Sequence, residues 1–194
     1  MADLFVEKET GIYGKGLFAK KLVPKGTIFH FVCKKCSIYS KEELARLPKD
    51  ELEFTLGHEI TNESGQLTNS CDKRILYINH SCNANTLRTG KGSGFDIVVK
   101  DIQKGEQATS DYRIYCDNLH FTNGCKCGEP NCMKGTTSKR PSPQKLQKFW
   151  DGKINAALKQ ISYVKQPLKM ELLKEHPELS YLFEAKPAKH IKRY

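Results

Sequence analysis

The chain divides into two parts by its pattern of apolar and polar residues. Up to about Cys132, short apolar runs such as those at 26–33 and 95–102 alternate with turn-forming residues, which predicts many short strands. After a polar, proline-bearing linker, apolar residues recur at helical spacing and predict an amphipathic helix; they are Leu146, Phe149, Trp150, Ile154, Ala157, Leu158 and Ile161. We therefore predict a mainly β fold with a C-terminal helical extension.

Shorter helical segments are predicted at two other places. Ser40 lies three residues before Glu43, a spacing that allows a capping box, and Pro48 is expected to break the helix that begins there. Another helical piece is predicted around 168–173. It should end near Pro177, with a further short turn containing Leu179, Leu182 and Phe183.

Length and hydropathy narrow the class of protein. A chain of 194 residues is long enough for one main core plus an appendage. Apolar runs such as 96–99 are far shorter than the roughly 20 residues of a membrane-spanning helix, and residues 1–11 lack the pattern of a signal peptide. We therefore expect no membrane contact and an intracellular protein, cytoplasmic or nuclear, or one secreted into a host cell if its source is a microbe.

Positive charge is concentrated in the C-terminal part. Residues 136–194 contain thirteen Lys and Arg against five Asp and Glu, and so contribute +8 of the net charge of +10. Either this segment attracts an anionic partner, such as nucleic acid, chromatin or an acidic protein, or it is a solvated helix face.

Three of the eight cysteines form a metal-binding pattern. Cys125, Cys127 and Cys132 follow the spacing C-x-C-x4-C, and the glycine and proline between them allow the chain to reverse. Thiolates suit zinc, and a structural zinc site takes four ligands. A fourth ligand must therefore come from elsewhere, and both His80 and Cys82 are candidates.

A second group of cysteines has two interpretations. Cys33 and Cys36 lie in sequence typical of a strand, and without a signal peptide we expect reduced thiols. We interpret them as two buried strand cysteines in preference to part of a second metal site with Cys71 and Cys116.

Glycines near the N-terminus match a nucleotide-binding spacing. Gly14, Gly16 and Ala19 fit G-x-G-x-x-A, but that fingerprint requires a helix directly after the glycines. A turn at 24–26 and a run typical of a strand follow instead. The dinucleotide-binding fold is therefore excluded, which leaves either a plain turn between strands or a loop whose backbone approaches another ligand.

Four motifs follow one another along the chain. They are the G-x-G loop at 14–16, NHSC at 79–82 after an apolar run that we interpret as a strand, GEQATSDY at 105–112, and the cysteine group at 125–132. Their order and gaps resemble the SET-domain protein lysine methyltransferases that have a zinc-binding post-SET segment. The resemblance covers roughly residues 5–135, and the joint pattern is far more specific than any single motif.

This resemblance implies a role for each matching residue. Cofactor-binding roles for S-adenosyl-L-methionine fall on Gly14, Lys15, Gly16, Asn79, His80 and Tyr112. Tyr112 would also be the catalytic residue, because it would line the lysine channel and orient the amine. The Zn²⁺ ligands would be Cys82, Cys125, Cys127 and Cys132.

The resemblance also implies an architecture and a reaction. The fold would be the SET-domain β-fold with a knot-like crossing, in which the NHSC segment passes beneath another loop. The domains would be a SET domain at 5–116, a post-SET zinc-binding segment at 117–137 and a basic helical extension at 138–194. The substrate would be a lysine of a histone or another basic protein, and the enzyme would mainly align the sulfonium with a neutral amine.

Some positions depart from the family pattern. Leu76 stands where an arginine is usual, and Phe54 is the nearest aromatic residue where a second channel tyrosine is expected. Ser110 stands where a large aromatic side chain is common, so we predict methylation beyond the monomethyl state. The aromatic residue that usually covers the adenine ring is missing, and its replacement would be Met133, Phe149 or Trp150, although Trp150 fits better as a core anchor of its helix.

Two other classes of function are alternatives. A zinc-stabilised nucleic-acid-binding module would explain the basic segment and the cysteines, but it leaves NHSC and GEQATSDY without a purpose. A SET-like domain that only binds partners would not need an intact Asn79, His80 and Tyr112.

Overall fold

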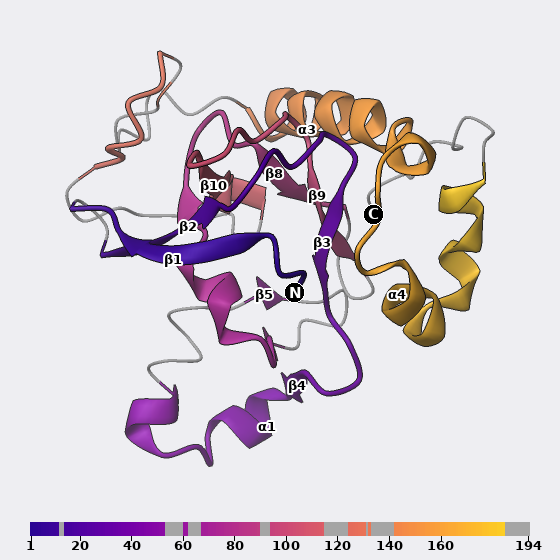
Figure 1. Ribbon diagram of the computed structural model, residues 1–194. Coiled ribbons are helices and arrows are strands. Elements are labelled where there is room, and N and C mark those ends of the chain that lie inside the picture. The colour runs from indigo at the N-terminus through magenta and orange to yellow at the C-terminus, as the bar shows by residue number, and fades with distance from the viewer. Residues whose placement is uncertain are drawn as a thin grey trace.

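Two β-sheets and a set of C-terminal helices make up the described part of the chain (Figure 1). In this computed structural model the described residues are 1–11, 14–52, 60–61, 67–89, 94–114, 124–130, 132 and 142–184. The prediction of a strand-rich first part followed by C-terminal helices is confirmed.

The larger sheet joins segments that are far apart in the sequence. Its strands are β1 (Phe5–Glu9), β2 (Lys15–Ala19), β3 (Ile28–Phe31), β7 (Asn79–His80), β8 (Thr86–Arg88), β9 (Phe95–Val98) and β10 (Gln107–Ser110). Their order is β1-β2-β10-β8-β9-β3, with β7 pairing β10 off this path. β10 runs antiparallel to β2 and parallel to β7 and β8, so it brings three motif-bearing segments side by side.

The smaller sheet lies in the segment between β3 and β7. It has the order β4-β6-β5, from β4 (Ser37–Tyr39), β5 (Ile60–Thr61) and β6 (Leu67–Asn69). The helix α1 (Lys41–Leu44) follows β4 and ends before Pro48. Its capping box is confirmed, because the Ser40 backbone N–H donates to Glu43 Oε2 at 2.7 Å and the Glu43 N–H donates to Ser40 Oγ at 3.2 Å.

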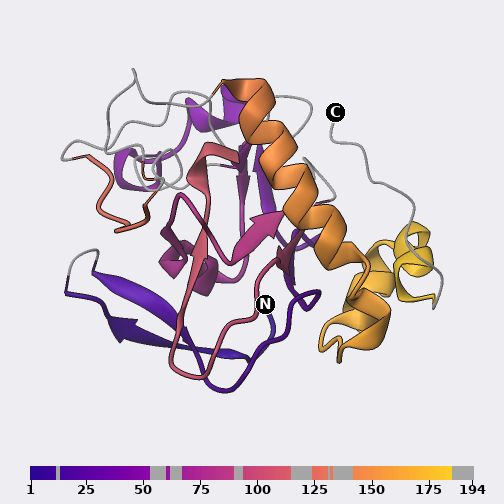
Figure 2. The same ribbon diagram turned by 90° about the horizontal axis from the view of Figure 1, so that it is seen from above.

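The C-terminal helices pack on the larger sheet and share its core. They are α3 (Pro143–Leu158), η4 (Ile161–Tyr163), α4 (Lys169–Glu175) and η5 (Pro177–Phe183). Figures 1 and 2 show α3 lying against the sheet. One hydrophobic cluster combines Leu87 and Ile97 of the sheet with Trp150, Ile154 and other apolar residues of the helices. The domain boundary at 138 stays a prediction, but the helices are not packed as a separate unit.

Two short segments differ from the strands predicted for them. The apolar run before Asn79 forms the 3₁₀ helix η1 (Lys73–Tyr77), because the Asp72 side chain caps it by accepting from the Arg74 N–H. The segment 33–36 is a turn, closed by a bond of 2.9 Å from the Cys36 N–H to the Cys33 carbonyl. The interpretation of Cys33 and Cys36 as strand cysteines is therefore wrong.

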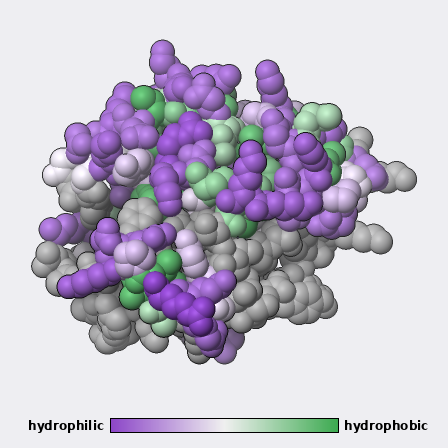
Figure 3. All heavy atoms as spheres, turned by 90° about the horizontal axis from the view of Figure 1, so that it is seen from below, coloured by the Kyte–Doolittle hydropathy of each residue, from purple (hydrophilic) through white to green (hydrophobic). Residues whose placement is uncertain are grey.

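On the face shown in Figure 3, most of the coloured residues are hydrophilic and the apolar areas between them are small. Within the described residues, no helix is both long enough and apolar enough to cross a bilayer.

The parallel pairing of β7 and β8 with β10 is consistent with a compact crossing of these strands, but the knot-like threading stays a prediction.

Candidate functional site

A polar cavity of about 300 Å³ lies beside β7 and β10. It is lined by Thr10, Asn79, His80, Ser81, Asn83, Asn85, Lys100, Glu106, Gln107, Thr109, Lys126, Cys127 and Glu129. Two of the predicted cofactor residues, Asn79 and His80, line the cavity. Gly14, Lys15, Gly16 and Tyr112 are adjacent to these two in the fold but do not line it.

Asn79 connects the glycine loop to the NHSC segment. Its side-chain amide donates to the Lys15 carbonyl at 3.0 Å. Its backbone is paired with Thr109 of β10, so the side chain is held at the strand edge. The two motifs predicted to bind one ligand are therefore joined directly.

In the G-x-G motif, Gly14 directly precedes β2, and Lys15 and Gly16 are the first residues of that strand. Gly14 has a φ of +67°, a conformation that favours glycine, and its carbonyl accepts from both the backbone N–H and the hydroxyl of Thr10. A Cβ at Gly16 would lie 2.2 Å from Gln107 Nε2 and 2.8 Å from Thr10 Cγ2. A side chain at position 16 would therefore displace the end of the Gln107 side chain, which packs directly over Gly16.

Gln107 also has a buried side-chain donor without a partner among the described residues. Within the part of the chain that the structure describes, its Nε2 has no hydrogen-bond partner. Buried polar groups are almost always paired, and an exception is often completed by a bound molecule. Gln107 also lines the cavity, so this buried amide lies in the cavity wall.

His80 is held as a neutral ring between Tyr112 and Cys82. Its Nδ1 accepts from the Tyr112 backbone N–H at 3.1 Å, so the ring proton lies on Nε2, which faces Cys82 Sγ at 3.3 Å. Burial lowers the pKa of His80 to about 4, and the ring is therefore uncharged at neutral pH.

The Tyr112 hydroxyl is oriented by the backbone of Ile78, which lies between η1 and β7. The hydroxyl donates to the Ile78 carbonyl at 2.7 Å, which leaves the lone pairs of its oxygen as acceptors. Burial raises the pKa of Tyr112 to about 12, so the phenol stays protonated throughout the physiological range.

A buried ion pair fixes the backbone on both sides of Tyr112. Arg113 donates to both carboxylate oxygens of Asp111, at 2.7 and 2.6 Å, and to the Cys82 carbonyl at 3.0 Å. The indole N–H of Trp150 on α3 donates to the same carboxylate at 2.9 Å. Asp111 was part of the motif, but no sequence signal indicated Arg113 or the partnership with Trp150, which lies 39 residues away.

α3 also supports the loop that follows NHSC. Lys153 Nζ donates to Asn83 Oδ1 at 2.9 Å and to the Ala84 carbonyl at 3.0 Å. The Asn83 amide in turn donates to Glu129 Oε2 at 3.2 Å, in the loop that contains the later cysteines. Burial lowers the pKa of Lys153. The helix thus holds one wall of the cavity, a role that the sequence analysis missed.

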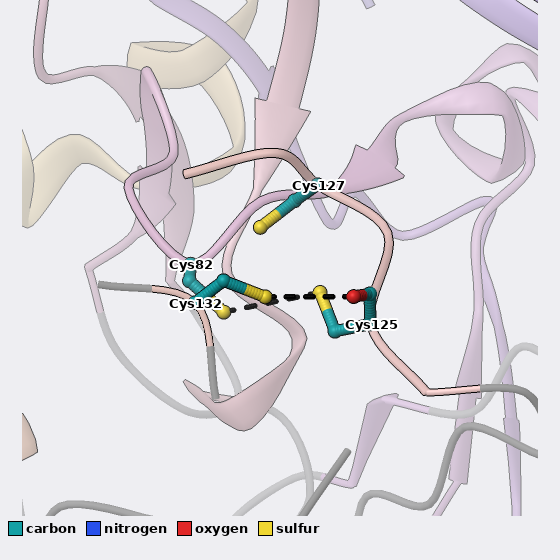
Figure 4. Close-up of side chains that lie close together, drawn as sticks. All are labelled: Cys82, Cys125, Cys127 and Cys132. Atoms are coloured by element: carbon teal, nitrogen blue, oxygen red, sulfur yellow. Dashed lines mark hydrogen bonds between the residues drawn. The ribbon is translucent and has the colours of Figure 1, made fainter. Parts of the chain in front are cut away.

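Four cysteines from two segments converge beside the cavity (Figure 4). They are the predicted ligands Cys82, Cys125, Cys127 and Cys132, and their sulfur atoms all lie within 4.8 Å of one another. The sulfurs of Cys82 and Cys125 are 3.9 Å apart. Zn–S bonds of about 2.3 Å place the sulfurs of a tetrahedral site about 3.8 Å apart, so the group fits Zn²⁺. His80, the other candidate for the fourth ligand, is not a member of the group, and its Nε2 is within hydrogen-bond distance of Cys82 Sγ.

A second group brings together Cys33, Cys36 and Cys71, whose sulfurs also lie within 4.8 Å of one another. Cys36 is buried, Cys33 is half-buried and Cys71 is exposed. Cys116, the other residue considered for this group, lies outside the described residues.

Two further positions singled out in the sequence, Trp150 and Ser110, lie within the described residues. Trp150 is 6% exposed and belongs to the core cluster, as predicted for a helix anchor. Ser110 is buried in β10, and its effect on the methylation state stays a prediction. Phe54 and Met133 lie outside the described residues.

Comparison with known proteins identifies a family. Residues 14–113 match the model of the SET domain. Among solved structures, the chain is similar to the crystal structure of a Plasmodium falciparum protein described as a "putative histone methyltransferase", with 18% identity and a TM-score of 0.43 over 58% of this chain and 95% of the other. That similarity is too low to support an argument about function. Curated proteins contain no match to this chain.

Proposed function

The chain belongs to the SET-domain family, and from this premise we propose that it transfers methyl groups from S-adenosylmethionine to lysine side chains of a protein substrate. The observation that supports the proposal most strongly is the cavity beside β7 and β10, because three residues of the NHSC motif, Asn79, His80 and Ser81, line it. Its walls also include Cys127, so the proposed cofactor and zinc sites are contiguous.

The charges of the cavity suit S-adenosylmethionine. Lys100 and Lys126 provide two cations, and Glu106 and Glu129 provide two carboxylates. The cofactor carries an amino group, a carboxylate and a sulfonium, and it therefore needs partners of both signs. Together with Asn79, His80 and Gln107, these residues would hold it.

In the proposed reaction the protein aligns the reactants and favours a neutral amine. The bound cofactor supplies an electrophilic methyl group. A free lysine has a pKa of about 10.4, and exclusion of water disfavours the ammonium form, so no dedicated base is required. The Tyr112 oxygen, with its own proton donated to the Ile78 carbonyl, would accept a hydrogen bond from the incoming amine and orient it.

Zinc would act on the same site through the backbone. Bound to Cys82, Cys125, Cys127 and Cys132, it would fasten the 124–132 segment to the NHSC segment. The substrate is proposed to be a histone or another basic protein, and contact of the basic C-terminal segment with nucleic acid or chromatin remains a prediction.

Calorimetric titration with S-adenosylmethionine and its demethylated product tests the proposal. The full chain, with its zinc content measured in the same sample, should bind each at one site, and Asn79→Ala should lose binding because the link to the Lys15 carbonyl is removed. Asn155→Ala on α3 is the matched control, since Asn155 does not line the cavity, and it should bind normally. If folded, zinc-replete protein binds neither compound, the methyltransferase proposal is wrong.

A further inference from the structure

Three cysteines lie together where the chain enters and leaves the smaller sheet, and they form a group separate from the Cys82 group. We propose that Cys33, Cys36 and Cys71 bind a second zinc ion, which fastens the segment 37–70 to the edge of the larger sheet. This site would be independent of the methyltransferase reaction and of the Cys82 group.

The distances between the sulfurs match a metal site. Cys33 Sγ lies 3.6 Å from Cys71 Sγ and 4.0 Å from Cys36 Sγ. Both values lie close to the separation of about 3.8 Å that a tetrahedral zinc imposes on its sulfur ligands. They are also close to the 3.9 Å between the sulfurs of Cys82 and Cys125 in the Cys82 group.

The local backbone is suited to negatively charged sulfur. Cys33 and Cys36 have the C-x2-C spacing of zinc-binding turns, and the turn is closed by the Cys36 N–H bond to the Cys33 carbonyl. The Cys71 backbone N–H donates to Cys36 Sγ at 3.4 Å, which stabilises a thiolate. Lys34 and Lys35 between the two cysteines are exposed and place positive charge next to the site.

Three thiolates leave one position of the tetrahedron for another ligand. Within the described residues, no further His, Cys, Asp or Glu joins the group at that distance. The fourth ligand is accordingly water or a group from outside those residues. A third converging thiol also favours a metal over a simple Cys33–Cys36 disulfide, which would leave Cys71 without a role.

The position of the site explains what the metal would do. Cys33 follows β3 and Cys71 follows β6, so one ion would join the two ends of the segment that holds the smaller sheet. Next to Cys71, Ser70 Oγ lies 3.0 Å from His30 Nε2, and the His30 ring is bonded to Asp96 of β9 at 2.6 Å. The metal and this buried network would anchor the segment at neighbouring residues.

The C-terminal helices meet the same turn. The Lys34 N–H donates to Glu175 Oε2 at 3.4 Å, and His176 Nε2 lies 3.2 Å from the Val32 carbonyl. The end of α4 is thus docked on the cysteine turn, and loss of the metal should loosen both this contact and the smaller sheet.

Metal content measured by native mass spectrometry tests the inference. The full chain, purified under reducing conditions with zinc present, should hold two zinc ions. Cys71→Ser should hold one and still bind S-adenosylmethionine if the proposed function is correct, and its amides at 67–72 should exchange hydrogen faster. Cys127→Ser is the matched control. It should also hold one ion, but the ion that it loses is the one at the Cys82 group.

Two results would overturn the inference. One is a wild-type protein that holds a single zinc ion even with zinc in excess. The other is a folded Cys71→Ser protein that keeps as many ions as the wild type. Should Cys71→Ser fail to fold, the wild-type stoichiometry decides. Failure of cofactor binding in the wild-type protein would contradict the proposed methyltransferase function and leave the metal count unaffected.

Discussion

At the residue scale, Tyr112 is constrained from both sides and through its hydroxyl. Its hydroxyl donates to the Ile78 carbonyl, its backbone N–H bonds His80, and its neighbours Asp111 and Arg113 form a buried ion pair. Truncation of one member of such a pair would leave a buried charge without a partner. The geometry of the proposed lysine channel therefore depends on residues that do not themselves touch the substrate.

Removal of the Tyr112 hydroxyl tests its proposed role. We expect Tyr112→Phe to lower kcat by about 10²–10³-fold, as for loss of one oriented polar group in an active site, because the amine loses its acceptor. Cofactor affinity should change little, since the ring is retained. Steady-state kinetics and calorimetry measure the two effects.

Tyr163→Phe is the control for the Tyr112 variant. It removes the same atom from a side chain that is 72% exposed and should leave kcat unchanged. A Tyr112→Phe enzyme with wild-type kcat would show that the hydroxyl has no part in the reaction.

At the scale of elements, α3 contributes to the proposed cofactor site although it lies outside the residues that match the SET domain. Lys153 donates a hydrogen bond to Asn83 in the loop after NHSC, and the Trp150 indole donates one to the Asp111 carboxylate. The helix begins at a cap in which Ser142 Oγ accepts from the Lys145 N–H, with Pro143 at its first position. A segment that charge and periodicity describe as a basic amphipathic helix thus also positions the site.

Lys153→Met tests this contribution. The two acceptors of its ammonium, Asn83 Oδ1 and the Ala84 carbonyl, would lose their partner, so we expect a loss of about 1–3 kcal/mol in the free energy of unfolding. The apparent Kd for S-adenosylmethionine should rise, because Asn83 lines the cavity. Urea unfolding and calorimetry measure the two quantities.

Lys148→Met on the same helix is the matched substitution, since Lys148 is exposed and should tolerate the change. Equal effects of the two variants would mean that Lys153 acts only through net charge.

At the scale of the whole molecule, the C-terminal helices complete the hydrophobic core. Leu146, Trp150 and Ile154 are buried in the same cluster as Leu87 and Ile97 of the sheet. Each large apolar side chain that is buried contributes about 1.5–3 kcal/mol. Several of them together are comparable with the total stability of a domain, about 5–15 kcal/mol. The helices are therefore expected to be necessary for folding.

Truncation at residue 141 should abolish cooperative unfolding. The exposed face of the sheet would then favour aggregation, and thermal unfolding followed by circular dichroism should show no sharp transition. A chain that ends at Glu184 keeps every helix of the cluster and should melt like the full chain. A sharp transition in the shorter truncation would show that residues 1–141 fold alone.

Local patterns in the sequence determined several features without reference to distant contacts. The Ser40 and Glu43 capping box and the α3 stripe depend on neighbours within a few residues, and both are present. The order of motifs likewise indicated the SET-domain family, which the match at 14–113 confirms. These features can be predicted because they depend on residue types and on their spacing along the chain.

Tertiary structure decided the features that depend on contacts between distant segments. Cys33 and Cys36 resembled strand residues in sequence, yet they lie in a turn next to Cys71. The hydrogen bond from the Cys71 backbone N–H to Cys36 Sγ joins residues that are 35 positions apart. In the same way the bond from Trp150 to Asp111 and the bonds of Lys153 to the NHSC loop link residues that no spacing rule relates. Which side chains meet across a core depends on how sheets and helices pack. This is why the cavity walls emerged only from the folded chain, and why the structure was needed to choose between the two interpretations of Cys33 and Cys36.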